Sequence, residues 1–133
     1  MMLKNKNLMG ILYLGAVGIS IGMLFFVIVC TIIGYEAKNQ CADSKAEYGG
    51  DCVEALISLL DDENKSFRSR NSAIWALGQL GDARALPVLE KYFTGNIPER
   101  ESLDGGISQY ELKKAIKLAG GGLNLTAWAW DED

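Results

Sequence analysis

The sequence predicts an all-α protein in which one long apolar helix is followed by a small array of two helical hairpins. Two observations support this prediction. Residues 9–35 contain no charged residue and no proline, whereas all 17 acidic residues and 11 of the 13 basic residues lie in 35–133. From residue 51 onward, apolar residues recur at the three- and four-residue spacing of amphipathic helices, interrupted by capping residues and glycines.

Length and composition exclude several classes of protein. A chain of 133 residues is long enough for one modest domain plus an appendage. It contains no histidine, which removes nucleophiles activated by histidine and nearly every zinc site. A net charge of −4 argues against binding to nucleic acid. The sequence therefore predicts no cofactor, no metal and no catalytic group.

Residues 9–34 are predicted to form a transmembrane helix, preceded by a short tail over 1–8. A bilayer core about 30 Å thick requires about 20 apolar residues, and this segment is longer. The alternative is a cleaved signal peptide, whose apolar part usually runs over about 7–15 residues. No small-residue cleavage site follows at 34–37, so a retained signal anchor is favoured.

The side of the membrane is predicted from the lysines that flank this helix. Lys4 and Lys6 precede the helix, and Lys38 and Lys45 follow it, so the simple count is equal. The first pair is more compact and lies beside the terminal amine. This favours a cytoplasmic amino terminus and an exported carboxyl-terminal domain.

Two cysteines, Cys41 and Cys52, flank a short polar stretch just beyond the predicted span. They could close a disulfide, which would agree with an oxidising compartment. The alternative is a pair of unrelated thiols, with Cys52 acting as a small apolar residue on a helix.

Three glycines, Gly15, Gly18 and Gly22, recur within the span and include a GxxxG pattern. In lipid, helices associate where small residues let their backbones approach closely. The pattern predicts a packing face for another helix; the alternative is a chance match, because glycine is common in membrane helices.

Beyond the span, residues 35–50 are polar, end in two glycines and are predicted to be a linker. Asp51, Ser66 and Ser108 are predicted helix caps, and Ser108 forms a capping box with Glu111. Gly81 is predicted to terminate a helix. The helices are expected over 52–61, 67–80, 83–94 and 109–119.

The segment from Val53 to Phe93 resembles a HEAT repeat of the short kind related to phycobilisome-lyase HEAT-like proteins. The resemblance rests on four sequence stretches: Leu59–Glu63, Phe67–Arg68, Ala73–Asp82 and Ala83–Leu89. It implies an armadillo-type α-solenoid over 51–120, built from two hairpins, whose curved surface recognises another protein. Gly78 is expected to allow close approach of a neighbouring helix, and Pro87 to start or kink the next one.

Two repeats are few, because stacked hairpins bury their core only against neighbours. A linker, the tail over 121–133, the membrane or another protein is expected to cover the open faces. Trp128 and Trp130 alternate with alanines in that tail, so they would cap the domain, enter the membrane interface or dock on a partner. The predicted protein-binding residues are Arg68, Trp75, Trp128 and Trp130, together with the 95–106 loop.

These observations predict a non-catalytic, membrane-anchored scaffold or adaptor whose domain binds another protein while its helix contacts the lipid bilayer. One alternative is an accessory subunit of a larger membrane complex, with the glycine face packed on a partner helix. A second alternative is a lyase-like enzyme, against which the absence of a histidine beside either cysteine argues.

Overall fold

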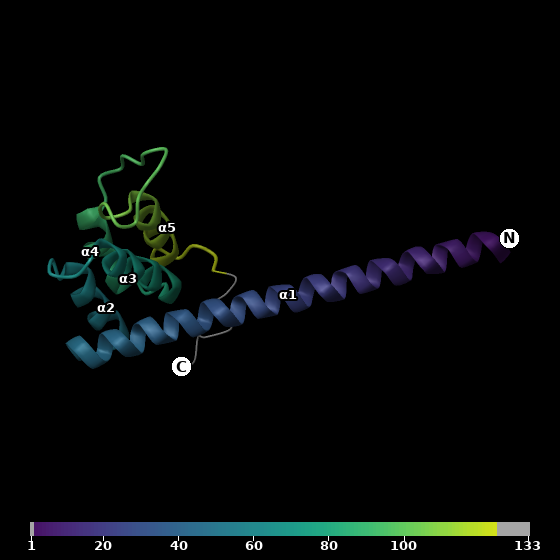
Figure 1. The fold of residues 1–133 in the computed structure, drawn as a ribbon, viewed down its shortest axis with the longest axis horizontal. Helices are drawn as coiled ribbons and strands as arrows, with labels where there is room; N and C mark the ends of the chain where they lie inside the picture. Colours follow the sequence, from purple (N-terminus) through teal and green to yellow (C-terminus); the bar gives the residue numbers. More distant parts are fainter. Residues whose placement is uncertain (1, 125–133) are drawn as a thin grey trace.

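The computed structural model describes residues 2–124, with side chains from residue 5 onward. Within this range the chain forms helices and loops without a strand, which confirms the predicted fold class. Figure 1 shows one very long helix with shorter helices folded against its carboxyl-terminal end. The elements are α1 (Met2–Tyr48), α2 (Cys52–Asp61), α3 (Phe67–Leu80), the 3-10 helix η1 (Ala83–Ala85), α4 (Leu86–Tyr92) and α5 (Gln109–Ala119).

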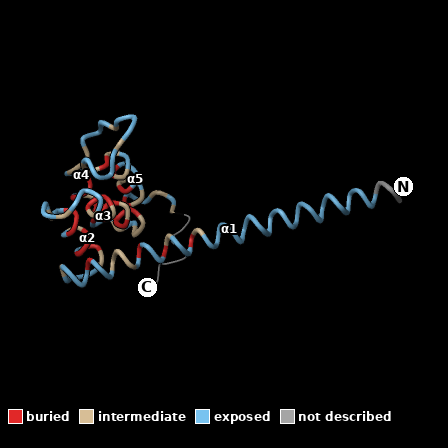
Figure 2. Tube along the Cα trace, viewed as in Figure 1, coloured by how far each residue is buried: buried red, intermediate tan, exposed pale blue. Residues whose placement is uncertain are grey.

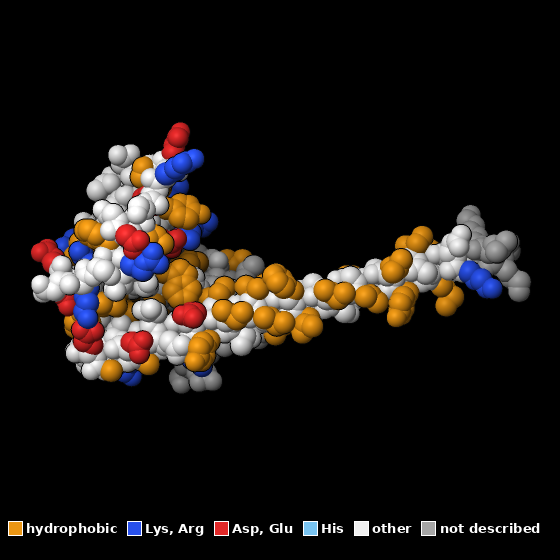
Figure 3. Space-filling view, viewed as in Figure 1, with side chains coloured by type: hydrophobic (Ala, Val, Ile, Leu, Met, Phe, Trp, Pro, Cys, Tyr) orange, Lys and Arg blue, Asp and Glu red, His pale blue; other side chains and the backbone are white. Residues whose placement is uncertain are grey.

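The first half of α1 stands apart from the rest of the molecule. The side chains of residues 5–28 are all exposed, and they form a largely apolar rod (Figures 2 and 3). By length and composition, α1 is able to cross a membrane. At a rise of about 1.5 Å per residue, residues 9–34 extend over about 39 Å, more than the roughly 30 Å of a bilayer core.

The second half of α1 differs from the expected linker. The sequence predicts a linker over 35–50, but the helix continues to Tyr48, and the chain turns at Gly49 and Gly50, which both have a φ of 74°. Two physical reasons explain the continuation. Residues 36–47 include many strong helix formers and no glycine or proline. One side of this segment is also buried, at Ala37 and Ser44.

The four short helices pack as two hairpins. α2 contacts α3, α4 contacts α5, and α3 lies against α5 across the junction between the hairpins. Their shared core is aliphatic, and each fully buried leucine or isoleucine contributes roughly 1.5–3 kcal/mol. The largest members with no exposed surface are Leu56, Leu60, Ile74, Leu77, Leu89 and Leu112.

The second half of α1 supplies a further layer of this stack, since it packs on α2 and on α3. Its inward side carries Ala37, Cys41, Ser44 and Tyr48, spaced by four, three and four residues. Three of these side chains are small, which lets the helices lie close together. α1 therefore covers one open face of the two-hairpin array.

The close contact expected at Gly78 lies between α3 and α5. A Cβ atom on Gly78 would come within 2.9 Å of the Ala115 Cα atom, so the two backbones touch where any side chain would interfere. Three residues later, Gly81 ends α3 with a left-handed φ of 65°. Pro87 lies in the first turn of α4, where its missing N–H has no helical partner to lose.

An arginine connects successive hairpins. Asp51 caps α2 and Asp82 caps η1, so the two aspartates begin corresponding helices. Arg84 donates from Nη1 to Asp51 Oδ2 at 2.6 Å and from Nη2 to Asp82 Oδ2 at 2.9 Å. In Asp51, hydrogen bonds from the backbone of Glu54 and from Arg84 lower the pKa of the carboxyl. The pairs hold one repeat in register with the next.

Candidate functional site

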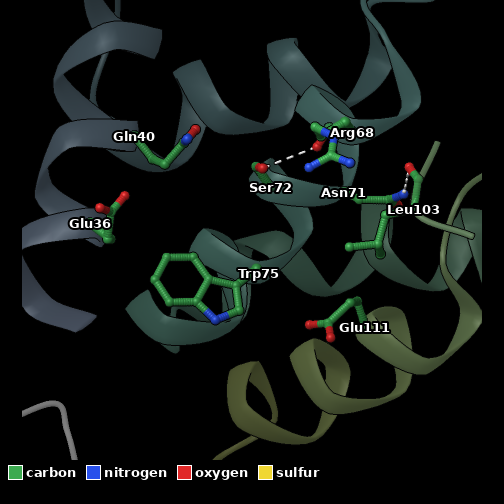
Figure 4. Close-up of a pocket in the computed structure, with 8 residues that line it drawn as sticks. All are labelled: Glu36, Gln40, Arg68, Asn71, Ser72, Trp75, Leu103 and Glu111. Carbon is green, nitrogen blue, oxygen red and sulfur yellow. Dashed lines mark hydrogen bonds between the residues drawn. The ribbon is translucent and has the colours of Figure 1, made fainter. Parts of the chain in front are cut away.

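A cleft of about 310 Å³ lies between α1, α3, α5 and the loop over 93–108. Figure 4 shows side chains from all four segments turned toward it. α3 contributes Arg68, Asn71, Ser72 and Trp75, which follow one another at the i, i+3, i+4 and i+7 positions of a single helix face. The other lining residues are Glu36, Gln40, Leu103 and Glu111.

Arg68 and Trp75 were expected at a protein-binding surface, and the structure places both in this cleft with Leu103 of the expected loop. The Trp75 indole is half-buried and points into the space between α1 and α5 (Figure 4). Leu103 leaves 46% of its surface exposed at the edge of the cleft. An aromatic face and an exposed aliphatic side chain therefore lie side by side with polar groups, as in many recognition sites.

Arg68 forms a two-pronged ion pair with Asp104 of the loop. Its Nε donates to Oδ1 at 2.8 Å, and its Nη2 donates to Oδ2 at 2.9 Å. These hydrogen bonds raise the pKa of the guanidinium and lower the pKa of the Asp104 carboxyl. Both side chains are well exposed, so the pair orients the loop and adds little to stability.

Asn71 holds the loop against α3, a role that the sequence analysis missed. The residue is 3% exposed, and its amide makes three hydrogen bonds. Nδ2 donates to the carbonyls of Leu103 and Gly106, both at 2.9 Å, and Oδ1 accepts from the Ser108 amide at 2.8 Å. A signal was present in the sequence, because an asparagine stands three residues before the core residue Ile74 on the same helix.

Glu101 completes the start of α5. Its carboxylate accepts from the Ser108 hydroxyl at 2.5 Å and from the amides of Gln109 and Tyr110 at 2.7 and 3.2 Å. Desolvation raises the pKa of this carboxyl, but the hydrogen bonds outweigh it, and the net pKa lies below the ordinary value. The anchor is seven residues upstream of the helix cap, so no local pattern marks it.

Only one of the two hydrogen bonds of the expected capping box between Ser108 and Glu111 is present. The Ser108 hydroxyl accepts from the Glu111 amide at 3.1 Å, as expected. The Ser108 amide, however, donates to Asn71 and not to the Glu111 side chain. Glu111 is therefore left to face the cleft, where it pairs with Lys114 at 2.9 Å.

The other expected site residues lie elsewhere. Gly15, Gly18 and Gly22 are on the exposed half of α1, with nothing near the position of a Cβ atom. Cys41 and Cys52 are joined as a disulfide that links α1 to α2, with Cα atoms 5.1 Å apart. Trp128 and Trp130 lie outside the described residues. Within 2–124, no group of His, Cys, Asp or Glu side chains could hold a metal ion.

The fold and the cleft define a small helical-repeat protein in which α1, α3 and α5 share one side of the stack. The chain belongs to the HEAT-repeat family, whose pattern matches residues 29–102. The match begins inside α1, well before the segment from Val53 to Phe93 that shows the resemblance most clearly. The second half of α1 is therefore part of the repeat array.

One similar protein is deoxyhypusine hydroxylase from Schizosaccharomyces pombe, which is 30% identical over 87 residues. The aligned region covers 64% of this chain and 26% of that protein, so the chain spans about a quarter of the curated relative that it matches. No solved structure matches the chain.

The expectation that this protein is not an enzyme is corrected by this relative. A hydroxylase is an enzyme, so at least one protein similar to this chain is catalytic. The expectation rested on the absence of histidine from the sequence. That absence excludes catalysis by histidine but does not exclude that similar proteins are enzymes. The similarity is distant and covers only part of the hydroxylase.

Proposed function

We propose that this protein is a single-pass, membrane-anchored adaptor that binds another protein in the cleft between α1, α3 and α5. The observation that carries the proposal is the position of the cleft on three alternate helices, α1, α3 and α5, of a HEAT-repeat stack. Repeats of this kind generate extended concave surfaces that recognise other proteins. Trp75 and Leu103 supply the apolar contacts that such a surface needs.

The anchor is supported by the exposed half of α1. Large apolar side chains follow one another along the visible face of this rod and are exposed among the described residues (Figure 3). Contiguous exposed apolar surface of this extent is unfavourable in water by about 25 cal/mol per Å². Insertion over 9–34 would remove that surface from water, and anchoring would raise the effective concentration of the cleft near a membrane-bound partner.

The continuity of α1 also determines where the cleft would lie. Glu36 and Gln40 follow directly after the apolar segment, within the same unbroken helix. At about 1.5 Å per residue, Glu36 lies roughly 3 Å beyond residue 34 along the helix axis. The cleft would then open beside the lipid headgroups, and its partner would be a protein held at the same membrane.

The remaining expectations extend this proposal. An exported domain agrees with the Cys41–Cys52 disulfide, because disulfides persist in oxidising compartments. Gly15, Gly18 and Gly22 would let a second membrane helix approach α1 closely. A stoichiometric assembly after extraction in mild detergent would favour an accessory subunit, and a monomer or dimer would favour the adaptor.

Site-specific photo-crosslinking in native membranes tests the proposal. A photoreactive amino acid replaces Ser72 in the cleft, and a matched variant carries it at Glu90, an exposed position on α4. We expect a discrete crosslinked protein from position 72 that is absent from position 90. We also expect the full chain to remain in the membrane pellet after an alkaline carbonate wash.

Two results would contradict the proposal. Equal crosslinking from both positions, or none from position 72, would show that the cleft is not the binding surface. Release of the chain by the carbonate wash would show that α1 is not a membrane anchor, whatever the cleft binds.

A further inference from the structure

We propose that the cleft recognises an arginine side chain of its partner, held by the Trp75 indole and the carboxylates of Glu36 and Glu111. This inference rests on the proposed protein-binding function and specifies the chemistry of the group that is bound.

The arrangement around Trp75 carries the first part of the argument. The indole projects from α3, while Glu36 approaches from α1 on one side and Glu111 from α5 on the other (Figure 4). A cation is attracted to the face of an aromatic ring, most strongly to tryptophan. A positive group beside this ring would also lie between two carboxylates that belong to different helices.

The charges that line the cleft carry the second part. Arg68 is the basic residue of the lining, and Asp104 neutralises it through two hydrogen bonds. Glu36 makes no ion pair with any residue that the structure describes. Glu111 has one, with Lys114, which is itself 47% exposed. The net charge available to a ligand is therefore negative.

The shape and hydration of the ligand favour arginine over lysine. A guanidinium is planar and weakly hydrated, so it stacks on an indole while its edge N–H groups donate to carboxylates. The ammonium of lysine is a compact and strongly hydrated charge that gains less from the flat ring. The cavity of about 310 Å³ is wide enough to admit such a side chain from solvent.

The same charge opposes an acidic occupant. Glu36 and Glu111 would repel a peptide segment rich in carboxylates. A basic segment of another protein is therefore the better match for this cleft.

Peptide binding to the full-length protein in detergent micelles tests the inference. The probe is a fluorescein-labelled decapeptide of alternating arginine and serine, and its affinity is measured by fluorescence anisotropy. We expect Glu36→Gln/Glu111→Gln to weaken binding about tenfold, which corresponds to a loss of about 1.4 kcal/mol. Trp75→Leu should weaken it by a similar factor, and the corresponding lysine–serine peptide should bind more weakly than the arginine peptide.

The matched control is Glu63→Gln/Glu90→Gln, which removes two exposed carboxylates outside the cleft and changes the net charge equally. We expect this control to change the affinity less than about twofold, because neither carboxylate lines the cleft. Neither double variant removes a side chain of the hydrophobic core, so circular dichroism should show the same helix content.

An equal loss in the control, equal affinity for both peptides, or no binding of the arginine peptide would overturn the inference. Crosslinking from position 72 separates this failure from the failure of the proposed function. If that crosslink persists while the peptide fails to bind, the protein-binding function stands and the arginine assignment falls.

Discussion

Asn71 is one of two buried polar side chains on α3, beside Arg70, on a helix whose other buried residues are apolar or glycine. Burial of an amide is unfavourable unless its hydrogen bonds are satisfied. Here Asn71 bonds to Leu103, Gly106 and Ser108, so both the amide and the loop are held. The loop in turn places Leu103 and Asp104 at the cleft, which makes Asn71 a positioning residue for a site whose ligand it need not touch.

Gly78 gives a prediction at the same scale. In Gly78→Ala, the new methyl group would meet the Ala115 Cα atom at 2.9 Å, so α3 and α5 must separate. Alanine gains up to about 1 kcal/mol of helix propensity, while overpacking costs roughly 1–3 kcal/mol. We expect a net decrease in the free energy of unfolding, measured as a lower thermal midpoint by circular dichroism.

The control for this change is Gly106→Ala, because the Cβ position at Gly106 meets open space and its φ is not left-handed. It should leave the midpoint nearly unchanged. A Gly78→Ala protein as stable as the parent would show that the two helices separate at no cost.

The amino terminus of α5 is capped in part by a residue outside the helix, Glu101, which lies seven positions before Ser108. The Ser108 hydroxyl accepts from the Glu111 amide, whereas Glu101 accepts from the two preceding amides, those of Gln109 and Tyr110, and from the Ser108 hydroxyl. A carboxylate at a helix amino terminus also interacts favourably with the helix dipole. The loop and the helix therefore stabilise each other through one ionised side chain.

This arrangement predicts a pH dependence. The folded pKa of Glu101 lies below its ordinary value of 4.5. Its stabilising contribution is therefore fully present above about pH 4.5 and is lost as the pH falls through the lowered folded pKa. Glu101→Gln lacks this contribution at every pH, so the stability difference between parent and variant should shrink on acidification from pH 6 to pH 3.

Urea denaturation at several pH values measures that difference. Subtracting the variant removes the contributions of the other carboxyls with lowered pKa values, such as Asp51 and Asp104. A constant difference across this range would show that the Glu101 carboxylate does not cap α5.

The helices differ in how far the sequence predicts them. The ranges 52–61, 67–80 and 109–119 agree with α2, α3 and α5, because caps and glycines mark their ends. The range 83–94 divides into η1 and α4, with Pro87 at the start of α4, and it ends two residues earlier than expected, at Tyr92.

The second half of α1 was missed for a physical reason. Its inward residues Ala37, Cys41 and Ser44 are small and only weakly apolar, so they give no hydrophobic periodicity. The cleft was therefore only half predictable. Arg68 and Trp75 could be selected on α3, whereas Glu36 and Glu111 join them only because α1 and α5 fold beside that helix.

For the molecule as a whole, the joint between α1 and α2 depends on a tight turn and a disulfide. Gly49 and Gly50 both take left-handed φ values, and the Cys41–Cys52 bond closes the turn. The bond holds the end of α1 against the repeats that it covers.

Cys41→Ser/Cys52→Ser should therefore reduce the free energy of unfolding by roughly 2–4 kcal/mol, since a short crosslinked loop restricts the unfolded chain. We also expect faster amide hydrogen exchange over 37–48, because α1 can then open locally from α2 and α3. Dithiothreitol should reproduce both effects in the parent and change nothing in the double variant. Identical exchange in the oxidised parent and the variant would argue against this role.

α1 runs without interruption from its apolar half into the repeats. The orientation of the domain about the helix axis is therefore fixed relative to the apolar half of α1. Inserting a single residue into α1 near position 34 would rotate everything beyond it by about 100° around the helix axis. Inserting three or four residues, about one helical turn, would bring the domain back close to its original orientation. The direction in which the domain faces its surroundings is therefore set by the number of residues in the apolar half of α1, which lies outside the cleft.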